Sequence, residues 1–254
     1  MKDMSNSLVI GDTSQLSYYL PKSFDKISSR NIDYSSMGEY ERIYVCFAEQ
    51  RTFKSDANFI DINYHYTLDV IDKILPKTNE VVFYSTAMLW QNLEQYDITD
   101  EFSYDENSKY LVSKEMISKE LEAKEKTIVH YPCNFNSCQR KKGYLFSKLI
   151  DACSGKSIET GNLNFDREIV HASYIADVST KSKCSQIIAP GYLVNIESYF
   201  RDVIDAFGYK FIDLIFQNLK ATTTQPKSVH KCIDMDYSYG KMLKDTIEDI
   251  RNTI

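Results

Sequence analysis

The chain has 254 residues, of which 43% are hydrophobic and 26% charged, which suits one globular domain or one large domain with a small appendage. Its formal net charge of −6 and pI of about 5.3 argue against a protein whose main partner is a nucleic-acid backbone. The N-terminal apolar run is too short for a signal peptide and no later run is long enough for a membrane span, so we expect a cytoplasmic protein with no membrane partner.

In the first half of the chain, short apolar runs alternate with helical patterns. Strands are expected at 7–12, 42–48, 80–87 and 127–132, and a further strand with its exit at 25–33. Helices are expected at 14–20, 61–75 and 109–126. Strands that alternate with helices form parallel sheets with helices on both faces. This order predicts an α/β fold with a doubly wound parallel sheet of the Rossmann type over residues 1–137.

After about residue 137 the pattern changes. A strand followed by a helix is expected over 167–178 and a loop over 222–228. Further helices are expected at 147–155, 196–208, 209–221 and 239–254. We interpret residues 138–254 as a mixed region that contributes late sheet elements and a small C-terminal lobe.

The cysteines and histidines indicate no metal site. The six cysteines form no CxxC pair, and the four histidines are widely scattered. We therefore expect reduced thiols and no bound metal.

The turn after the first expected strand reads GDTSQLS. Gly11 suits the tight turn of a dinucleotide fingerprint, and Ser14 and Ser17 stand where the fingerprint has small residues. Gln15 and Leu16 would open the helix whose N-terminus faces the pyrophosphate. The turn therefore favours dinucleotide binding, with an ordinary strand–turn–helix as the alternative.

The end of the second expected strand bears on the choice of cofactor. An acidic residue there would bind a ribose 2′-hydroxyl, whereas an arginine with small polar neighbours suits a 2′-phosphate. The chain has Ser28, Ser29 and Arg30. This favours NADP over NAD, and a solvated turn is the alternative.

A tyrosine and a lysine stand one helical turn apart in YLVSK, as Tyr110 and Lys114. A nearby ammonium lowers the pKa of a phenol, which then gives or takes a proton in carbonyl reduction or alcohol oxidation. The strand before this helix ends in Ser85 and Thr86, whose hydroxyls could hold the carbonyl oxygen at the same edge of the sheet. The alternative is a surface helix with a chance pair, because the same spacing recurs at Tyr18 and Tyr237.

In order and spacing, the chain resembles the extended short-chain dehydrogenase/reductases, the group of nucleotide-sugar epimerases, dehydratases and reductases. The resemblance covers most of the chain and rests on eight segments, VIGDTSQLSYYL, IYVCFAEQ, INYHYTLDVIDKI, VVFYSTAMLW, YLVSKEMISKEL, IVHYPCNFNS, REIVHASYIADV and IIAPGYLVNIESYFRDVIDAFG. It implies that residues 1–137 bind a dinucleotide and that the C-terminal lobe binds substrate.

The resemblance assigns roles to single positions. It implies a catalytic hydroxyl at Thr86, a catalytic acid/base at Tyr110 and its lysine at Lys114. The cofactor contacts that it and the turn imply are Gly11, Ser14, Gln15, Leu16, Ser29, Arg30, Ala48, Asn63, Ser85 and Pro132. The substrate contacts that it implies are Ser85, Thr86, Asn134 and Arg167. His171 is expected to be structural.

The function implied is an NAD(P)-dependent oxidoreductase of a nucleotide-activated sugar, a 4-keto sugar reductase in surface polysaccharide precursor synthesis. No carboxylate follows Thr86, which argues against dehydration. The alternatives are a nucleotide-sugar 4-epimerase and a non-catalytic nucleotide-binding or regulatory protein. The resemblance also implies a homodimer joined through helices 61–75 and 109–126, with Leu111 and Ile117 in the seam.

Overall fold

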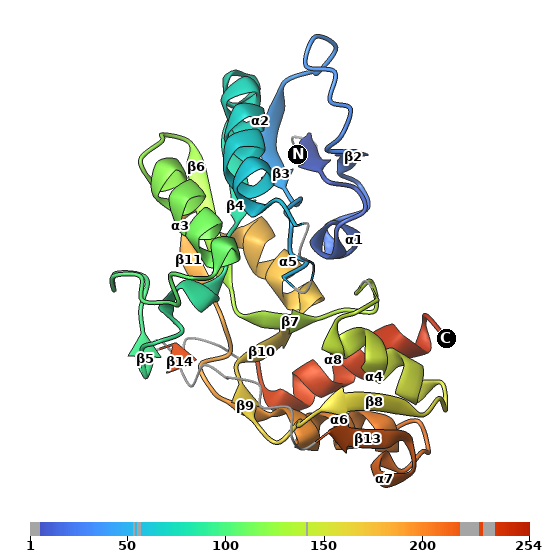
Figure 1. Cartoon of the computed structure of the whole chain (residues 1–254). Helices are drawn as coiled ribbons and strands as arrows, with labels where there is room; N and C mark the ends of the chain where they lie inside the picture. Colours follow the sequence, from blue (N-terminus) through green and yellow to red (C-terminus); the bar gives the residue numbers. More distant parts are fainter. Residues whose placement is uncertain (1–5, 53, 55–56, 141, 219–228, 231–236) are drawn as a thin grey trace. The chain divides into compact units, whose positions relative to one another are not determined.

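The computed structural model describes residues 6–52, 54, 57–140, 142–218, 229–230 and 237–254 (Figure 1). The chain forms two compact units. The first comprises Met1–Trp90, Glu101–Pro132 and Ile175–Ile188, and the second Gln91–Asp100, Cys133–Tyr174 and Ala189–Ile254. Within the described residues, no helix is long and apolar enough to cross a membrane.

The first unit is built on a six-stranded sheet in the order β11-β6-β4-β3-β1-β2. Its strands are β1 (Ser7–Ile10), β2 (Asp25–Ile27), β3 (Tyr40–Val45), β4 (Thr78–Tyr84), β6 (Thr127–Pro132) and β11 (Gln186–Ile188). Every neighbouring pair is parallel, which confirms the predicted α/β doubly wound sheet. The order reverses at β1, which has β2 on one side and β3 on the other, and open α/β sheets bind ligands at such a point.

Helices cover both faces of this sheet. They are α1 (Gln15–Tyr19), the π-helix η1 (Asp61–Tyr66) that continues as α2 (Thr67–Ile74), the 3-10 turns η2 (Leu75–Lys77) and η3 (Ala87–Trp90), α3 (Lys109–Glu122) and α5 (Ala172–Lys181). Lys114 of α3 lies over the Phe83 ring, whereas Arg42 donates to the Ser179 carbonyl of α5. Phe83 pairs with Val45 of β3, so their side chains point to the same face of the sheet. Val45 and Arg42 are three residues apart on β3, so their side chains point to opposite faces. The helices α3 and α5 therefore lie on opposite faces.

The second unit combines helices with short two-stranded pairs. The helices are α4 (Leu145–Cys153), α6 (Ile196–Asp205), α7 (Phe211–Leu214) and α8 (Tyr239–Arg251). The pairs are β5 (Gln95–Tyr96) with β14 (Val229–His230), β7 (Asn134–Asn136) with β10 (Ile169–His171), β8 (Ile158–Gly161) with β13 (Ile215–Asn218), and β9 (Asp166–Arg167) with β12 (Val194–Asn195).

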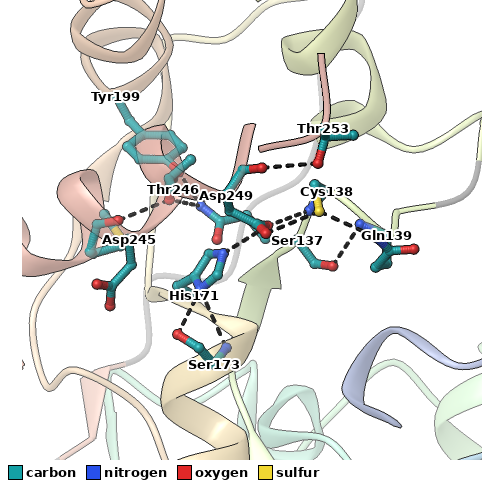
Figure 2. A network of polar contacts seen from close by, with 12 residues as sticks. Ser137, Cys138, Gln139, His171, Ser173, Tyr199, Asp245, Thr246, Asp249 and Thr253 are labelled. Atoms are coloured by element: carbon teal, nitrogen blue, oxygen red, sulfur yellow. Dashed lines mark hydrogen bonds and ion pairs between the residues drawn. The ribbon is translucent and has the colours of Figure 1, made fainter. Parts of the chain in front are cut away.

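A polar network centred on Asp249 attaches α8 to β10 and to the end of β7 (Figure 2). The Asp249 carboxylate accepts the Cys138 backbone N–H at 2.8 Å and its thiol at 3.0 Å. His171 Nε2 lies 3.1 Å from the same carboxylate, and its Nδ1 lies 2.8 Å from Ser173 Oγ. Both ring nitrogens of His171 are thus engaged, which suits the structural role expected for it.

Two expectations are wrong. The helix predicted over 209–221 ends at Leu214, and Ile215–Asn218 form β13, because Ile215 and Phe216 suit a strand that pairs with β8. Residues 219–228, including the predicted loop, lie outside the described residues. Leu111 and Ile117 cannot form a dimer seam, because they are 2% and 0% exposed and belong to the core of their own unit.

Candidate active site

The turn after β1 requires a glycine at its first position. Gly11 has a φ of +104°, and a Cβ there would come within 3.0 Å of the Phe47 backbone nitrogen. The backbone N–H groups of Gly11 and Asp12 both donate to the Ile27 carbonyl, at 2.9 and 3.2 Å. The turn therefore lies against the ends of β2 and β3 and leaves no room for a side chain.

The two serines of the fingerprint are compatible with this turn. Ser14 has an ordinary φ of −77° and caps α1 by accepting the Ser17 N–H at 3.1 Å. Ser17 is fully buried, and its hydroxyl lies 2.7 Å from the Asp12 carbonyl and 2.8 Å from the Ser14 carbonyl. Neither position needs a positive φ, and both hydroxyls have backbone partners, so serine can replace glycine at each.

Other residues of the turn fit a dinucleotide. Gln15 opens α1, and its Oε1 is buried with no hydrogen-bond partner among the described residues. Leu16 is buried in the core. After β2, the Ser29 carbonyl accepts the Tyr66 hydroxyl and Arg30 is exposed. The exposed guanidinium of Arg30 is accessible to a phosphate group, and the roles of these residues toward a dinucleotide stay predictions.

Asn63 holds the backbone of the segment after β3 by hydrogen bonds. Asn63 is 1% exposed and lies in η1, and π-helices are frequent at functional sites. Its Oδ1 accepts the Glu49 N–H at 2.7 Å, and its Nδ2 donates to the Glu49 carbonyl at 3.0 Å and to Ser113 Oγ at 3.1 Å. Asn63 thus fixes the segment of the half-buried Ala48 and the buried Glu49 and joins it to α3.

The end of β4 and the start of α3 carry the predicted hydroxyls and lysine. Ser85 and then Thr86 follow the last residue of β4. Thr86 is 7% exposed, and its Oγ1 accepts the Met88 N–H at 3.3 Å. Tyr110 lies in the first turn of α3, half-buried, with its ring edge-on to Phe59. Lys114 is one turn further along the helix, so all of these residues belong to the first unit.

Lys114 is a buried cation with a perturbed pKa. Its side chain is 1% exposed, and Nζ donates to the Tyr84 carbonyl at 3.0 Å. Burial lowers the pKa of Lys114 from 10.5 to about 7. Desolvation disfavours the charged form of a lysine, and such pKa values are typical of functional sites.

The residues predicted to bind substrate divide between the units. Ser85 and Thr86 lie in the first unit, whereas Asn134 and Arg167 lie in the second. Pro132, a predicted cofactor contact, ends β6 in the first unit. Arg167 Nη1 donates to Asn134 Oδ1 at 2.9 Å, and burial lowers the pKa of Arg167 to about 10. In the first unit, Ser85 Oγ lies 2.7 Å from Ser118 Oγ, so this hydroxyl already has a protein partner.

Three residues around the site were not predicted from the sequence. Ser113 joins α3 to Asn63, Ser118 joins α3 to Ser85, and Glu49 forms an ion pair with Arg51. The two serines could have been recognised in the sequence, because small polar residues at 113 and 118 stand on the apolar face of an otherwise charged helix. The Glu49–Arg51 pair leaves no comparable pattern.

The comparisons with known proteins agree with this geometry. No protein-family model and no curated protein sequence matches the chain. Among solved structures, RMD from Pseudomonas aeruginosa complexed with NADPH matches at 12% identity, with a TM-score of 0.75 over 98% of this chain and 100% of that one. UDP-N-acetylglucosamine 4-epimerase from Methanobrevibacter ruminantium, in complex with UDP-N-acetylmuramic acid, matches at 15% identity, with a TM-score of 0.79 over 99% and 98%.

A third match is dTDP-glucose 4,6-dehydratase from Bacillus anthracis in complex with NAD, at 16% identity and a TM-score of 0.72 over 97% of this chain and 96% of that one. The chain has the fold of the extended short-chain dehydrogenase/reductases. The resemblance seen in the sequence is confirmed at this level. At such low identities, the likeness to extended dehydrogenase/reductases shows the fold, and the roles of single residues stay predictions.

Proposed function

We propose that the chain is an NAD(P)-dependent oxidoreductase of a nucleotide-activated sugar, and specifically a 4-keto sugar reductase. The observation that carries this is Lys114, a buried lysine bonded to the end of β4 one helical turn after Tyr110. Burial of a cation lowers the stability of the fold, and a lysine one helical turn after a phenol suits a role in proton transfer. The matched structures bind NADPH, NAD and nucleotide sugars, which supports the cofactor and the substrate class.

Each residue has a defined part in this proposal. The bound dinucleotide would supply the hydride. Tyr110 would give its phenolic proton to the carbonyl oxygen, Thr86 would hold that oxygen by a hydrogen bond, and Lys114 would favour the phenolate that remains. Arg30 would bind a 2′-phosphate and so favour NADPH, which suits net reduction.

The dinucleotide would lie at the reversal point of the sheet. Gly11, Ser14, Gln15 and Leu16 would line the pyrophosphate side. Ser29, Ala48, Asn63, Ser85 and Pro132 are proposed as the remaining cofactor contacts, and Ser85 and Thr86 of the first unit as substrate contacts. Asn134 and Arg167 of the second unit are also proposed to bind substrate. Asn63 and Ser85 each bond to protein groups, and we propose that they also hold the backbone beside the cofactor in place.

A 4-epimerase is the second candidate, because an epimerase structure matches the chain with a TM-score of 0.79. An epimerase returns its dinucleotide unchanged and would retain NAD during purification. It would interconvert sugar epimers without net consumption of NADPH. A reductase consumes one NADPH for each sugar reduced, so the stoichiometry separates the two.

The test is NADPH oxidation with a nucleotide 4-keto sugar, preceded by titration with NADPH and NADH. Tyr110→Phe and Thr86→Ala should each lower kcat about 100-fold or more while the fold is retained. Tyr18→Phe is a matched control, since Tyr18 also precedes a lysine by four residues but is 56% exposed. Binding of neither dinucleotide, or full activity of Tyr110→Phe, would overturn the proposal.

The wider setting is also proposed. A cytoplasmic location and a place in surface polysaccharide precursor synthesis follow from the substrate class. A homodimer stays a prediction from the resemblance, although Leu111 and Ile117 do not form its interface. Light scattering at micromolar concentration tests the dimer, and a monomeric mass would contradict it.

A further inference from the structure

One buried hydroxyl connects the two segments that carry the proposed catalytic groups. Ser118 lies on α3 one turn after Lys114 and is fully buried. Its Oγ donates to the Lys114 carbonyl at 2.7 Å and lies 2.7 Å from Ser85 Oγ. Because Ser118 has one hydroxyl proton and gives it to that carbonyl, Ser85 must be the donor in the pair.

The Ser118–Ser85 bond completes a set of bonds around the end of β4. The Ser85 N–H donates to the His130 carbonyl of β6 at 2.8 Å, and Lys114 Nζ donates to the Tyr84 carbonyl at 3.0 Å. The backbone is therefore held at Tyr84 by α3 and at Ser85 by β6. The hydroxyl bond is the one that fixes the side chain of Ser85, directly before Thr86.

A buried hydroxyl pair is not needed for packing at this position. Burial of a hydroxyl without a partner costs about 1 to 3 kcal/mol, and an alanine pair of similar shape would avoid that risk. Nearby, the Tyr131 phenol of β6 donates to the Glu122 carboxylate of α3. Ser118 thus connects α3 to the end of β4.

We propose that Ser118 is a positioning residue that acts through Ser85 to set the placement of Thr86 relative to Tyr110 and Lys114. This rests on the proposed reductase function. Catalysis of this kind depends on placement, and a misplacement of about 1 Å can lower a rate about 100-fold. The cofactor turn after β1 lies two strands from β4, so Ser118 should affect the chemical step and not the affinity for NADPH.

The test is a double-mutant cycle of Ser118→Ala, Ser85→Ala and the double variant. We expect each single change to lower kcat about tenfold or more, and Ser118→Ala to leave the KM for NADPH within about twofold of wild type. The double variant should be no slower than the slower single variant, since both remove the same link. Losses that multiply in the double variant, or a kcat unchanged by Ser118→Ala, would overturn the proposal.

Ser179→Ala is the matched control for lost stability. Ser179 is also fully buried and bonds back to its own helix, at the Ile175 carbonyl (2.5 Å), but on the other face of the sheet. We expect this variant to keep its kcat, and an equal loss would assign the Ser118 effect to general destabilisation.

A measurement that needs no substrate separates this inference from the proposed function. Hydrogen exchange followed by mass spectrometry should show faster exchange over residues 85–88 in Ser118→Ala and no change over 11–17. Unchanged exchange over 85–88 would overturn the link even if the enzyme is a reductase. If the wild type does not oxidise NADPH, the reductase proposal fails, and the exchange result still decides whether Ser118 holds this segment.

Discussion

Replacement of Lys114 by methionine should change how the stability of the first unit depends on pH. Lys114 is 1% exposed, and burial lowers its pKa from 10.5 to about 7. Between these two pH values the unfolded chain holds a proton that the folded chain has lost, so the free energy of unfolding rises with pH. Each pKa unit corresponds to about 1.36 kcal/mol, so the lysine costs the folded state roughly 4 kcal/mol at pH 7 and about 2 kcal/mol at pH 9.

Lys114→Met removes this dependence together with one hydrogen bond to Tyr84, worth about 1 kcal/mol. The variant should be more stable than wild type at pH 7, and its advantage should shrink by about 2 kcal/mol by pH 9. It should also lose reductase activity.

Urea unfolding at pH 7, 8 and 9 measures this change through the fluorescence of Trp90. This residue is the single tryptophan, is fully buried and lies in the same unit as Lys114. Lys119→Met is the control, because the Lys119 side chain on the same helix is 65% exposed. Parallel stability curves for wild type and Lys114→Met would refute the reasoning.

Three further predictions concern other parts of the molecule. Gly11→Ala should lower the free energy of unfolding by about 1 to 2 kcal/mol and abolish NADPH binding, because φ is +104° and the added Cβ would meet Phe47; normal binding in a titration would contradict this. Arg30→Ala should weaken NADPH binding about tenfold and leave NADH binding unchanged, since a charge-assisted hydrogen bond is worth about 1.5 kcal/mol or more; an equal effect on both cofactors would argue against a 2′-phosphate contact. Asp249→Ala should lower the free energy of unfolding by about 3 kcal/mol in urea, because Cys138 and His171 lose their shared acceptor, and a change below about 0.5 kcal/mol would be inconsistent with the network in Figure 2.

The sheet of the first unit could be predicted because its local signals are consistent. β6 has the predicted bounds, since an apolar run at 127–132 ends in a proline. α3 begins at the predicted residue, where Ser108 caps it. The edge strand β2 ends at Ile27, a point that the sequence pattern over 25–33 did not locate.

Contacts between distant segments could not be predicted in the same way. The apolar face of α3 could be recognised, but not whether Leu111 and Ile117 face the sheet or a second subunit. Asn63 was expected at the cofactor, and its bonds to the backbone of Glu49 could not be predicted because tertiary structure sets that partner. The local pattern predicted a helix at β13, and the strand could not be recognised because its partner β8 lies far away in the sequence.

The most direct test of the account is a crystal structure of the chain with NADPH. We predict that the pyrophosphate lies on the Gly11 turn, the 2′-phosphate at Arg30, and the nicotinamide at the end of β4 within reach of Thr86 and Tyr110. A nicotinamide remote from both hydroxyls, or a turn after β1 that excludes the dinucleotide, would contradict the central claim.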